Sequence, residues 1–171
     1  MIESGRVILR ALERSDLERW RSWVNDPEIA ALVDRILPVT QPEHEDFFDR
    51  AVMRNTSAIW FAMVDPSTKE YIGNVWLWDI DSRHRRAEVR IIIGSRAHWG
   101  GGYGSEALRL VSDYAFAKVG LHKVYAFVLA RNARALASFH KAGFKDEARL
   151  AEEIYADGRF DDVWRVYRLA P

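Results

Sequence analysis

The sequence predicts a single α/β domain over residues 1–171, in which strands and helices pack around one core. Three observations lead to this expectation. The run Glu88–Ile93 is rich in β-branched residues, and a glycine-rich segment and a helical pattern of apolar residues ending at Gly120 follow it. Three further strand-like runs precede this unit, and the residues after Lys145 alternate like a hairpin. A chain of this length can bury a substantial core.

Composition narrows the functional classes. Hydrophobic residues make up 49% and charged residues 29% of the chain, as in globular proteins. No apolar run approaches the roughly 18 residues that cross a bilayer, and no signal peptide is visible. The formal net charge of +0 offers no attraction to nucleic acid or anionic membranes, and the lack of cysteine excludes disulfides and thiol chemistry. We therefore expect a cytoplasmic protein acting on a small molecule or a protein terminus, without nucleic-acid or membrane partners.

The N-terminal third is expected to hold one strand and two helices. Arg6–Arg10 alternates like a strand. The spacing of Ser15–Glu18 is that of a capping box opening a helix, and Asn25–Pro27 ends that helix. A short helical turn is expected over Glu28–Val33. The capping-box spacing recurs at the start of a second helix over Thr40–Val52.

The remaining elements follow in the same way. Four runs of apolar and β-branched residues predict strands: Ala58–Val64, Tyr71–Trp78, Ala87–Gly94 and Val124–Leu129. Asn132 is a favourable N-cap for a helix that Gly143 ends. The alternating residues Lys145–Leu169 are expected to form a closing hairpin that turns at Asp157 and Gly158.

The segment Trp99–Ser105 is the most informative motif. Its glycines allow positive φ angles, so several N–H groups and the positive end of the next helix can point at one ligand. This predicts a phosphate or pyrophosphate site, with a plain strand-to-helix turn as the alternative. A P-loop is disfavoured because no lysine follows the glycines. A dinucleotide site is disfavoured because the next strand ends in Ala130–Asn132, without an acidic residue.

The order of motifs resembles the GNAT superfamily of N-acetyltransferases, and within it the branch of ribosomal-protein N-terminal and polyamine acetyltransferases. The residues that carry it are Trp99–Leu108, Tyr114-Ala-Phe116, Asn132-x-x-Ala135 and Lys141-Ala-Gly-Phe144, and the resemblance runs from about Arg6 to Leu169. It implies a mixed, mostly antiparallel sheet of about seven strands flanked by about four helices, splayed near Ile92. It also implies acetyl-CoA as acyl donor, and a homodimer as the assembly. The histidines show no metal-ligand spacing, so no metal is expected.

The resemblance also implies which residues contact the donor. They are Ile91, Ile92, Ile93, Trp99, Gly100, Gly101, Gly102, Tyr103, Gly104, Ser105, Asn132, Phe139 and Lys141. Backbone N–H groups of the strand Ile91–Ile93 would polarise the acetyl carbonyl, and Asn132 would lie near the pantetheine arm. A loose basic set near the expected adenosine 3′-phosphate comprises Arg96, Arg134, His140 and Lys141, which a solvated surface explains almost as well.

Acetyl transfer to an amine requires a proton acceptor, because an alkylamine with a pKa of about 10.4 is mostly protonated at neutral pH. By its position in the family, Glu88 is the candidate. The alternative is a strand carboxylate paired with Arg86 or Arg90. Since no residue suits a covalent acetyl intermediate, the amine is expected to attack directly in a ternary complex.

The general acid is less clear from the sequence. Many relatives have a tyrosine where this chain has Phe139, and the ribosomal-protein branch has a serine where it has Ala135. Ser138 or His140 could replace them, although successive helix positions diverge by about 100°. A thiolate with a pKa of about 8.5 can also leave without a dedicated acid.

Carboxylates crowd the segments around the expected donor site. They are Asp26, Glu28, Asp34, Glu43, Glu45, Asp46, Asp49, Asp146, Glu147, Glu152, Glu153, Asp157, Asp161 and Asp162. An acidic rim would suit a cationic acceptor such as a polyamine, an aminoglycoside or other amino sugar, or a basic protein N-terminus, while a solvated surface is the simpler explanation. Two rival functions remain: a non-catalytic acyl-CoA-binding or sensing domain, and a small dinucleotide-binding protein.

Overall fold

In the computed structural model, which describes residues 1–32, 38–156 and 158–171, eight strands form one sheet in the order β1-β2-β3-β4-β5-β6-β8-β7. The strands are β1 (Ile2–Glu3), β2 (Ile8–Ala11), β3 (Ile59–Val64), β4 (Tyr71–Asp81), β5 (Arg86–Ile93), β6 (Lys123–Leu129), β7 (Lys145–Ala156) and β8 (Arg159–Leu169). Only the β5–β6 pair is parallel among them. The predicted mixed, mostly antiparallel sheet is confirmed, with the two-residue β1 as the additional strand.

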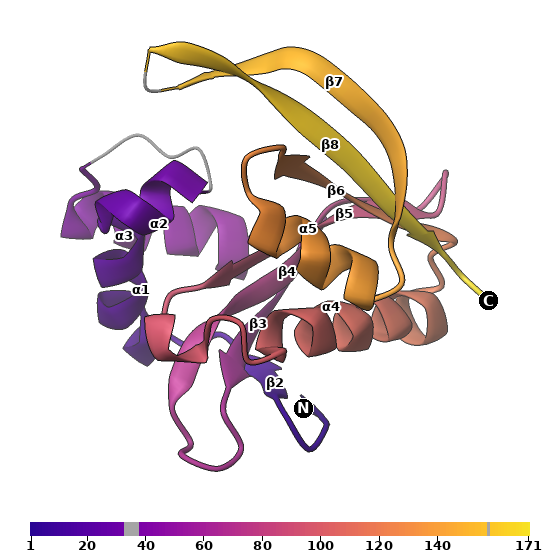
Figure 1. The fold of residues 1–171 in the computed structure, drawn as a ribbon. Coiled ribbons are helices and arrows are strands. Elements are labelled where there is room, and N and C mark those ends of the chain that lie inside the picture. Colours follow the sequence, from indigo (N-terminus) through magenta and orange to yellow (C-terminus); the bar gives the residue numbers. More distant parts are fainter. Residues whose placement is uncertain (33–37, 157) are drawn as a thin grey trace.

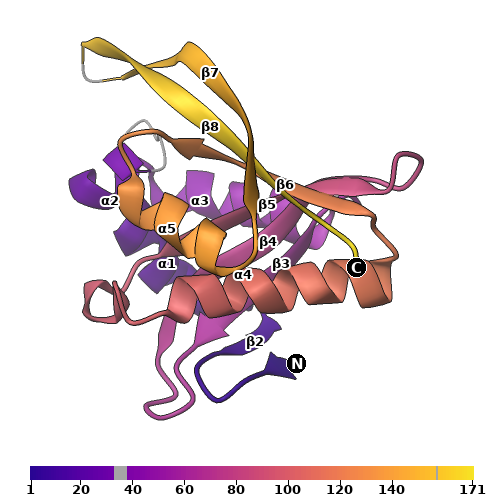
Figure 2. The same ribbon diagram turned by 45° about the vertical axis from the view of Figure 1, so that its right-hand side comes forward.

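Helices cover both faces of the sheet. They are α1 (Leu17–Val24), α2 (Pro27–Leu32), α3 (Gln41–Phe48), α4 (Tyr103–Tyr114) and α5 (Ala133–Lys141). In Figures 1 and 2, α4 and α5 lie on one face and α1–α3 on the other. None of the helices in the described ranges is long and apolar enough to span a membrane.

Two apolar clusters attach these helices to the sheet. The cluster beneath α4 and α5 contains Val89 and Leu108, and Ile91 and Ile93 pack against it. The cluster beneath α1 and α3 contains Ile92, together with several tryptophans. Since side chains alternate along a strand, β5 supplies both clusters.

The parallel β5–β6 pair is short. Its register covers only Arg86–Glu88 against Lys123–Tyr125, although β5 continues to Ile93 and β6 to Leu129. The two strands therefore separate after Glu88, as the expected splay near Ile92 requires. Beyond this point the edge of β5 that faces β6 has no strand partner in the described sheet.

Most predicted element boundaries hold. The capping box at Thr40 is confirmed, since Thr40 Oγ1 accepts the Glu43 N–H at 3.4 Å and Glu43 Oε2 accepts the Thr40 N–H at 2.8 Å. Asn132 caps α5 by accepting the Ala135 N–H at 3.1 Å. The expected helix end at Val33, the acidic Asp34 and the hairpin turn residue Asp157 lie outside the described residues.

The capping box predicted at Ser15 and Glu18 is wrong. The structure forms it two residues earlier, where the Glu13 N–H donates to Asp16 Oδ2 at 2.9 Å. The reason is an ion pair: Arg10 donates two hydrogen bonds of 2.7 Å to the Asp16 carboxylate. Asp16 is thereby fixed at the start of the helix, and the first turn begins as a 3₁₀ helix, η1 (Arg14–Asp16).

Candidate functional site

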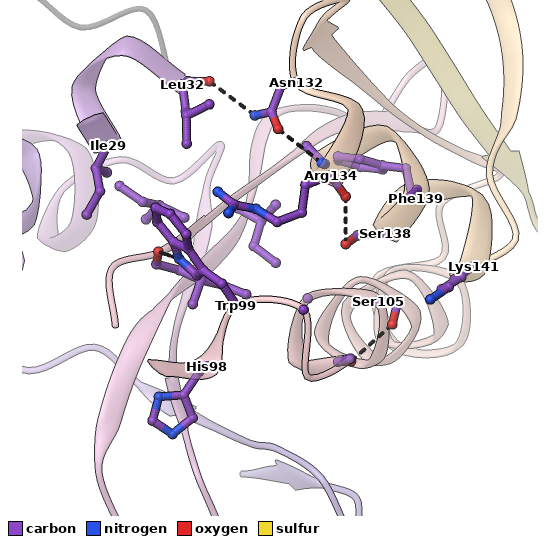
Figure 3. A pocket seen from close by; sticks show the side chains of 18 residues that line it. Ile29, Leu32, His98, Trp99, Ser105, Asn132, Arg134, Ser138, Phe139 and Lys141 are labelled. Atoms are coloured by element: carbon purple, nitrogen blue, oxygen red, sulfur yellow. Dashed lines mark hydrogen bonds between the residues drawn. The ribbon is translucent and has the colours of Figure 1, made fainter. Parts of the chain in front are cut away.

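A cavity of about 190 Å³ lies at the open edge of β5, between the glycine segment, α5 and α2 (Figure 3). Its lining includes every predicted donor-binding residue except Gly101 and Tyr103, and it includes Ser138. Sequence reasoning missed His98 and Ala137 in this lining. It also missed Ile29 and Leu32, which α2 contributes. Their only local signal was apolar character in a short helix, which core packing explains equally well.

The glycine segment prepares one end of the cavity for an anion. Gly102 caps α4 with φ +83°, a conformation that strains other residues. The first helical hydrogen bond runs from the Glu106 N–H to the Gly102 carbonyl at 3.1 Å, so the N–H groups of residues 103–105 lack helical partners. At Gly104 a Cβ atom would lie 3.3 Å from the Ile93 side chain, so glycine lets α4 approach β5 closely.

The open edge of β5 presents backbone donors. The Gly94 N–H donates to Ile72 of β4 at 3.0 Å, so the adjoining Ile93 carbonyl points away from β4. That carbonyl accepts the indole N–H of Trp99 at 2.7 Å. Because backbone groups alternate along a strand, the N–H groups of Ile91 and Ile93 also point toward the open edge. Two donors of this kind can polarise a carbonyl group placed between β5 and α5.

Three elements converge at the opposite end of the cavity from Lys141 (Figure 3). The Arg134 guanidinium lies 3.6 Å from the centroid of the Trp99 ring, a close cation–π contact. Asn132 Nδ2 donates to the carbonyl of Leu32 in α2 at 3.5 Å. The first turn of α5 thus bridges the glycine segment and α2.

Two other residues of the basic set, Lys141 and Arg96, lie in different places. Lys141 lines the cavity on the same side as Ser105 (Figure 3). Arg96 is not among the lining residues, and it pairs with Asp26 at 2.6 Å and with Glu28 at 3.0 Å.

The two candidates for the general acid lie in different places. Ser138 lines the cavity, and its hydroxyl donates to the Arg134 carbonyl at 3.1 Å. His140 is exposed, does not line the cavity, and pairs with Asp146 of β7 at 2.8 Å. Phe139 lines the cavity but is only 3% exposed, with its ring edge-on to Phe144. Of the two candidates, only Ser138 brings its side chain to the cavity lining.

Glu88 occupies the last paired position before the strands separate, opposite Tyr125. It is 9% exposed and does not line the cavity. Arg90 donates to both of its carboxylate oxygens, so the pairing expected as the alternative is present. The pKa of Tyr125 is raised, first by burial and then by the Glu88 charge. Glu88 shares its face of β5 with Ile92, which does line the cavity.

The acidic residues are largely paired with arginines of this chain. Besides the Arg96 pairs, Asp46 pairs with Arg50 at 2.7 Å and Asp162 with Arg149 at 2.6 Å. These pairs favour a solvated charged surface over a continuous acidic rim. Among the described residues there is no group of three or more histidine and carboxylate side chains placed to hold a metal ion.

Comparisons with known proteins agree with this geometry. The family described as acetyltransferase (GNAT) domain matches residues 6–145. The spermidine N(1)-acetyltransferase of Vibrio cholerae is 32% identical over 166 residues, covering 97% of this chain and 94% of that protein. The spermidine N(1)-acetyltransferase of Escherichia coli K12 is 30% identical over 176 residues, covering 97% and 87%.

Solved structures are similar over the same length. The crystal structure of the V. cholerae spermidine N-acetyltransferase in complex with CoA and spermine has a TM-score of 0.89 and 32% identity, and covers 97% of this chain and 96% of that chain. A dodecameric structure of the same V. cholerae enzyme has a TM-score of 0.80 at 32% identity, covering 97% and 95%.

Proposed function

Because this chain belongs to the GNAT acetyltransferase family and is an acetyl-CoA-dependent N-acetyltransferase, we propose that its acceptor is a polyamine such as spermidine. The observation that carries the proposal is similarity to spermidine acetyltransferases along 97% of the chain, including the elements that border the cavity. A polyamine is therefore favoured over an amino sugar or a protein N-terminus. The same similarity favours an enzyme over a sensing domain. It also favours a coenzyme A thioester over a dinucleotide as the ligand of the cavity.

The cavity suits the chemistry of the donor. The unpaired N–H groups of residues 103–105 can bind a pyrophosphate, and Lys141 lines the same side. The apolar walls contributed by Ile91, Ile93 and Phe139 suit a narrow pantetheine arm. At the open edge of β5, the N–H groups of Ile91 and Ile93 would donate to the thioester oxygen as negative charge develops on it.

Proton transfer is assigned to Glu88. The amine must lose a proton before it attacks, and Glu88 lies where β5 and β6 separate, on the face that also bears Ile92. Because Glu88 does not line the cavity, we propose that water relays the proton to it. The nitrogen forms a bond to the acetyl carbon, the carbon–sulfur bond breaks, and the thiolate leaves. We assign protonation of that thiolate to Ser138, which lines the cavity, and solvent can replace it.

We also propose that the protein assembles as a homo-oligomer, with a dimer as the basic unit. The β7–β8 hairpin extends beyond the rest of the molecule in both views (Figures 1 and 2). Near its tip, Tyr155 and Phe160 are 65% and 60% exposed with their rings in contact. Two exposed aromatic side chains on a projecting hairpin are unusual for a free surface. The cytoplasmic location stays a prediction.

The proposal is tested by thiol release from acetyl-CoA with a panel of amines. The panel holds spermidine, spermine, an aminoglycoside, an amino sugar nucleotide and short peptides with free N-termini. We expect spermidine or spermine to give the highest kcat/KM. A higher kcat/KM with an amino sugar or a peptide would contradict the polyamine proposal. Tight acetyl-CoA binding without turnover of any amine would instead support the sensing alternative.

A further inference from the structure

Asp65 connects both ends of the glycine segment to the body of the protein. It directly follows β3 and is 4% exposed. Its Oδ2 atom accepts a hydrogen bond from the Tyr103 hydroxyl at 2.9 Å and lies 3.1 Å from Nε2 of His98. His98 directly precedes Trp99, and Tyr103 directly follows Gly102, so the two residues flank the glycines Gly100–Gly102. One carboxylate oxygen therefore holds the residues on either side of the glycines.

The other carboxylate oxygen is fixed by the turn that carries Asp65. Oδ1 accepts the Ser67 N–H at 2.8 Å and the Ser67 hydroxyl at 2.7 Å. The turn is closed by the Asp65 N–H, which donates to the Glu70 carbonyl at 2.9 Å. The two hydrogen bonds from Ser67, followed by those from Tyr103 and His98, hold the pKa of Asp65 well below its ordinary value. The carboxylate is thus charged and oriented, and hydrogen bonds to a charged acceptor are the stronger kind.

His98 is anchored at both ring nitrogens. Its Nδ1 lies 2.8 Å from the Ser95 hydroxyl, and the Ser95 N–H donates to Ile72 of β4 at 3.2 Å. The His98 ring is 8% exposed and stands edge-on to the Tyr103 ring, with centroids 4.9 Å apart. The segment is therefore tied to β4 on one side and to the β3–β4 turn on the other.

These anchors matter because the three glycines, unlike Trp99, have no side chains that could hold them in place. Gly100–Gly102 carry no side chains, and glycine loses more conformational freedom on ordering than any other residue. A free segment would lose that freedom when a ligand binds, and affinity would fall accordingly. Asp65 and Tyr103 border a shallow depression on the outer side of the segment, not the main cavity. Asp65 can therefore influence a ligand in the main cavity only through other residues.

We infer that Asp65 is a positioning residue for the acyl donor: through His98 and Tyr103 it holds the glycine segment in the shape that presents its N–H groups to the pyrophosphate. The inference rests on the proposed role of this segment in pyrophosphate binding. It predicts that loosening either anchor weakens donor binding while the chemical step stays intact.

Tyr103→Phe is the mildest test, because it keeps the ring and removes one hydrogen bond. We expect the Kd of CoA, measured by calorimetry, and the KM for acetyl-CoA to rise roughly threefold to tenfold. The kcat at saturating acetyl-CoA should stay unchanged. Tyr114→Phe is the matched control, since Tyr114 lies on the same helix with its ring against Phe61, and it should leave the Kd unchanged.

Assays with a second acyl donor distinguish a loss of positioning from a general loss of structure. S-acetylpantetheine lacks the pyrophosphate, so its KM should be the same in the unmodified protein and in Tyr103→Phe. In Asp65→Asn without donor, the amide hydrogens of residues 99–105 should exchange faster than in the unmodified protein. His98→Gln tests the other anchor, and because His98 also lines the cavity, its effect counts as positioning only where the KM for S-acetylpantetheine stays unchanged.

Two results would overturn the inference. One is an unchanged CoA Kd in folded Tyr103→Phe and His98→Gln. The other is a KM for S-acetylpantetheine that rises as much as that for acetyl-CoA. Failure of the pyrophosphate proposal itself would look different, because the unmodified protein would then use both donors with equal KM.

Discussion

Arg90 binds both carboxylate oxygens of Glu88, with Nε at 2.7 Å from one and Nη2 at 2.9 Å from the other. The same guanidinium lies 5.4 Å from the centroid of the Trp78 ring. A cationic acceptor that approaches Glu88 must therefore compete with a cation of the protein.

We expect Arg90→Gln to lower the KM for spermidine, by about threefold to tenfold, because it removes both the competing hydrogen bonds and a repulsive charge. Steady-state kinetics at saturating acetyl-CoA would measure the change. Arg83→Gln removes the same charge from the turn between β4 and β5 and should leave the KM unchanged. An equal or higher KM in Arg90→Gln would show that Arg90 does not compete with the acceptor.

Glu88→Gln should lower kcat by about a hundredfold or more, because glutamine cannot accept the amine proton. The loss should be largest below about pH 8, where fewer amine molecules are already deprotonated. The pH–rate profiles of variant and unmodified protein provide the measurement. If the two profiles have the same shape, Glu88 is not the proton acceptor.

Gly102→Val should abolish donor binding. The φ of +83° at this position is strained for a β-branched residue, at a cost of about 1–3 kcal/mol, and relaxing that strain would move the adjacent N–H groups. Calorimetric titration with acetyl-CoA gives the affinity. Gly120 has a similar φ of +78° directly after the π-helical turn Ala115–Val119 that continues α4, with no atom within 4 Å of an added Cβ. Gly120→Val should therefore lose stability but bind the donor normally, and undiminished affinity in folded Gly102→Val would refute the assigned role.

Phe139→Tyr should raise kcat, by up to about a hundredfold if protonation of the thiolate limits turnover, because it places a hydroxyl at the cavity wall. Phe144→Tyr adds the same hydroxyl to a buried ring that does not line the cavity, and it should lower stability without raising kcat. Thiol release under saturating conditions distinguishes the two. An unchanged kcat in Phe139→Tyr would mean that proton supply to sulfur is not limiting.

Asp65 should also make the free energy of unfolding depend on pH in the acidic range. Its folded pKa lies below its ordinary value of 3.8, so the unfolded chain binds the proton first as pH falls. The stabilisation is complete above the unfolded pKa and is lost as pH falls toward the folded one. Compared with the unmodified protein, Asp65→Asn should be less stable in urea at pH 7, and the difference should shrink at about pH 3. A destabilisation of the same size at pH 7 and at about pH 3 would contradict this role of the Asp65 charge.

The sequence predicted those features that depend on local patterns. The strand β5, the glycine segment and the helix α4 follow each other in sequence. The spacing of apolar residues and the positions of the glycines therefore suffice to locate them. The wall formed by Ile29 and Leu32 could not be predicted, because tertiary packing alone brings α2 to the cavity. Which of Ser138 and His140 faces the cavity depends on the rotation of α5 about its axis. Only the packing of α5 on the sheet fixes that rotation, so the sequence could not predict it.

The hydrogen bond between Trp99 and the Ile93 carbonyl has one more consequence. A sheet that opens in its middle exposes a row of unpaired backbone groups, and such a row can pair with a strand of another molecule and lead to aggregation. Here the indole N–H occupies the Ile93 carbonyl, and Arg134 covers the face of the indole. A slender ligand can still reach the remaining N–H groups, but a full peptide strand would have to displace both side chains. Trp99, which lines the cavity, therefore also protects the opened sheet from intermolecular strand pairing.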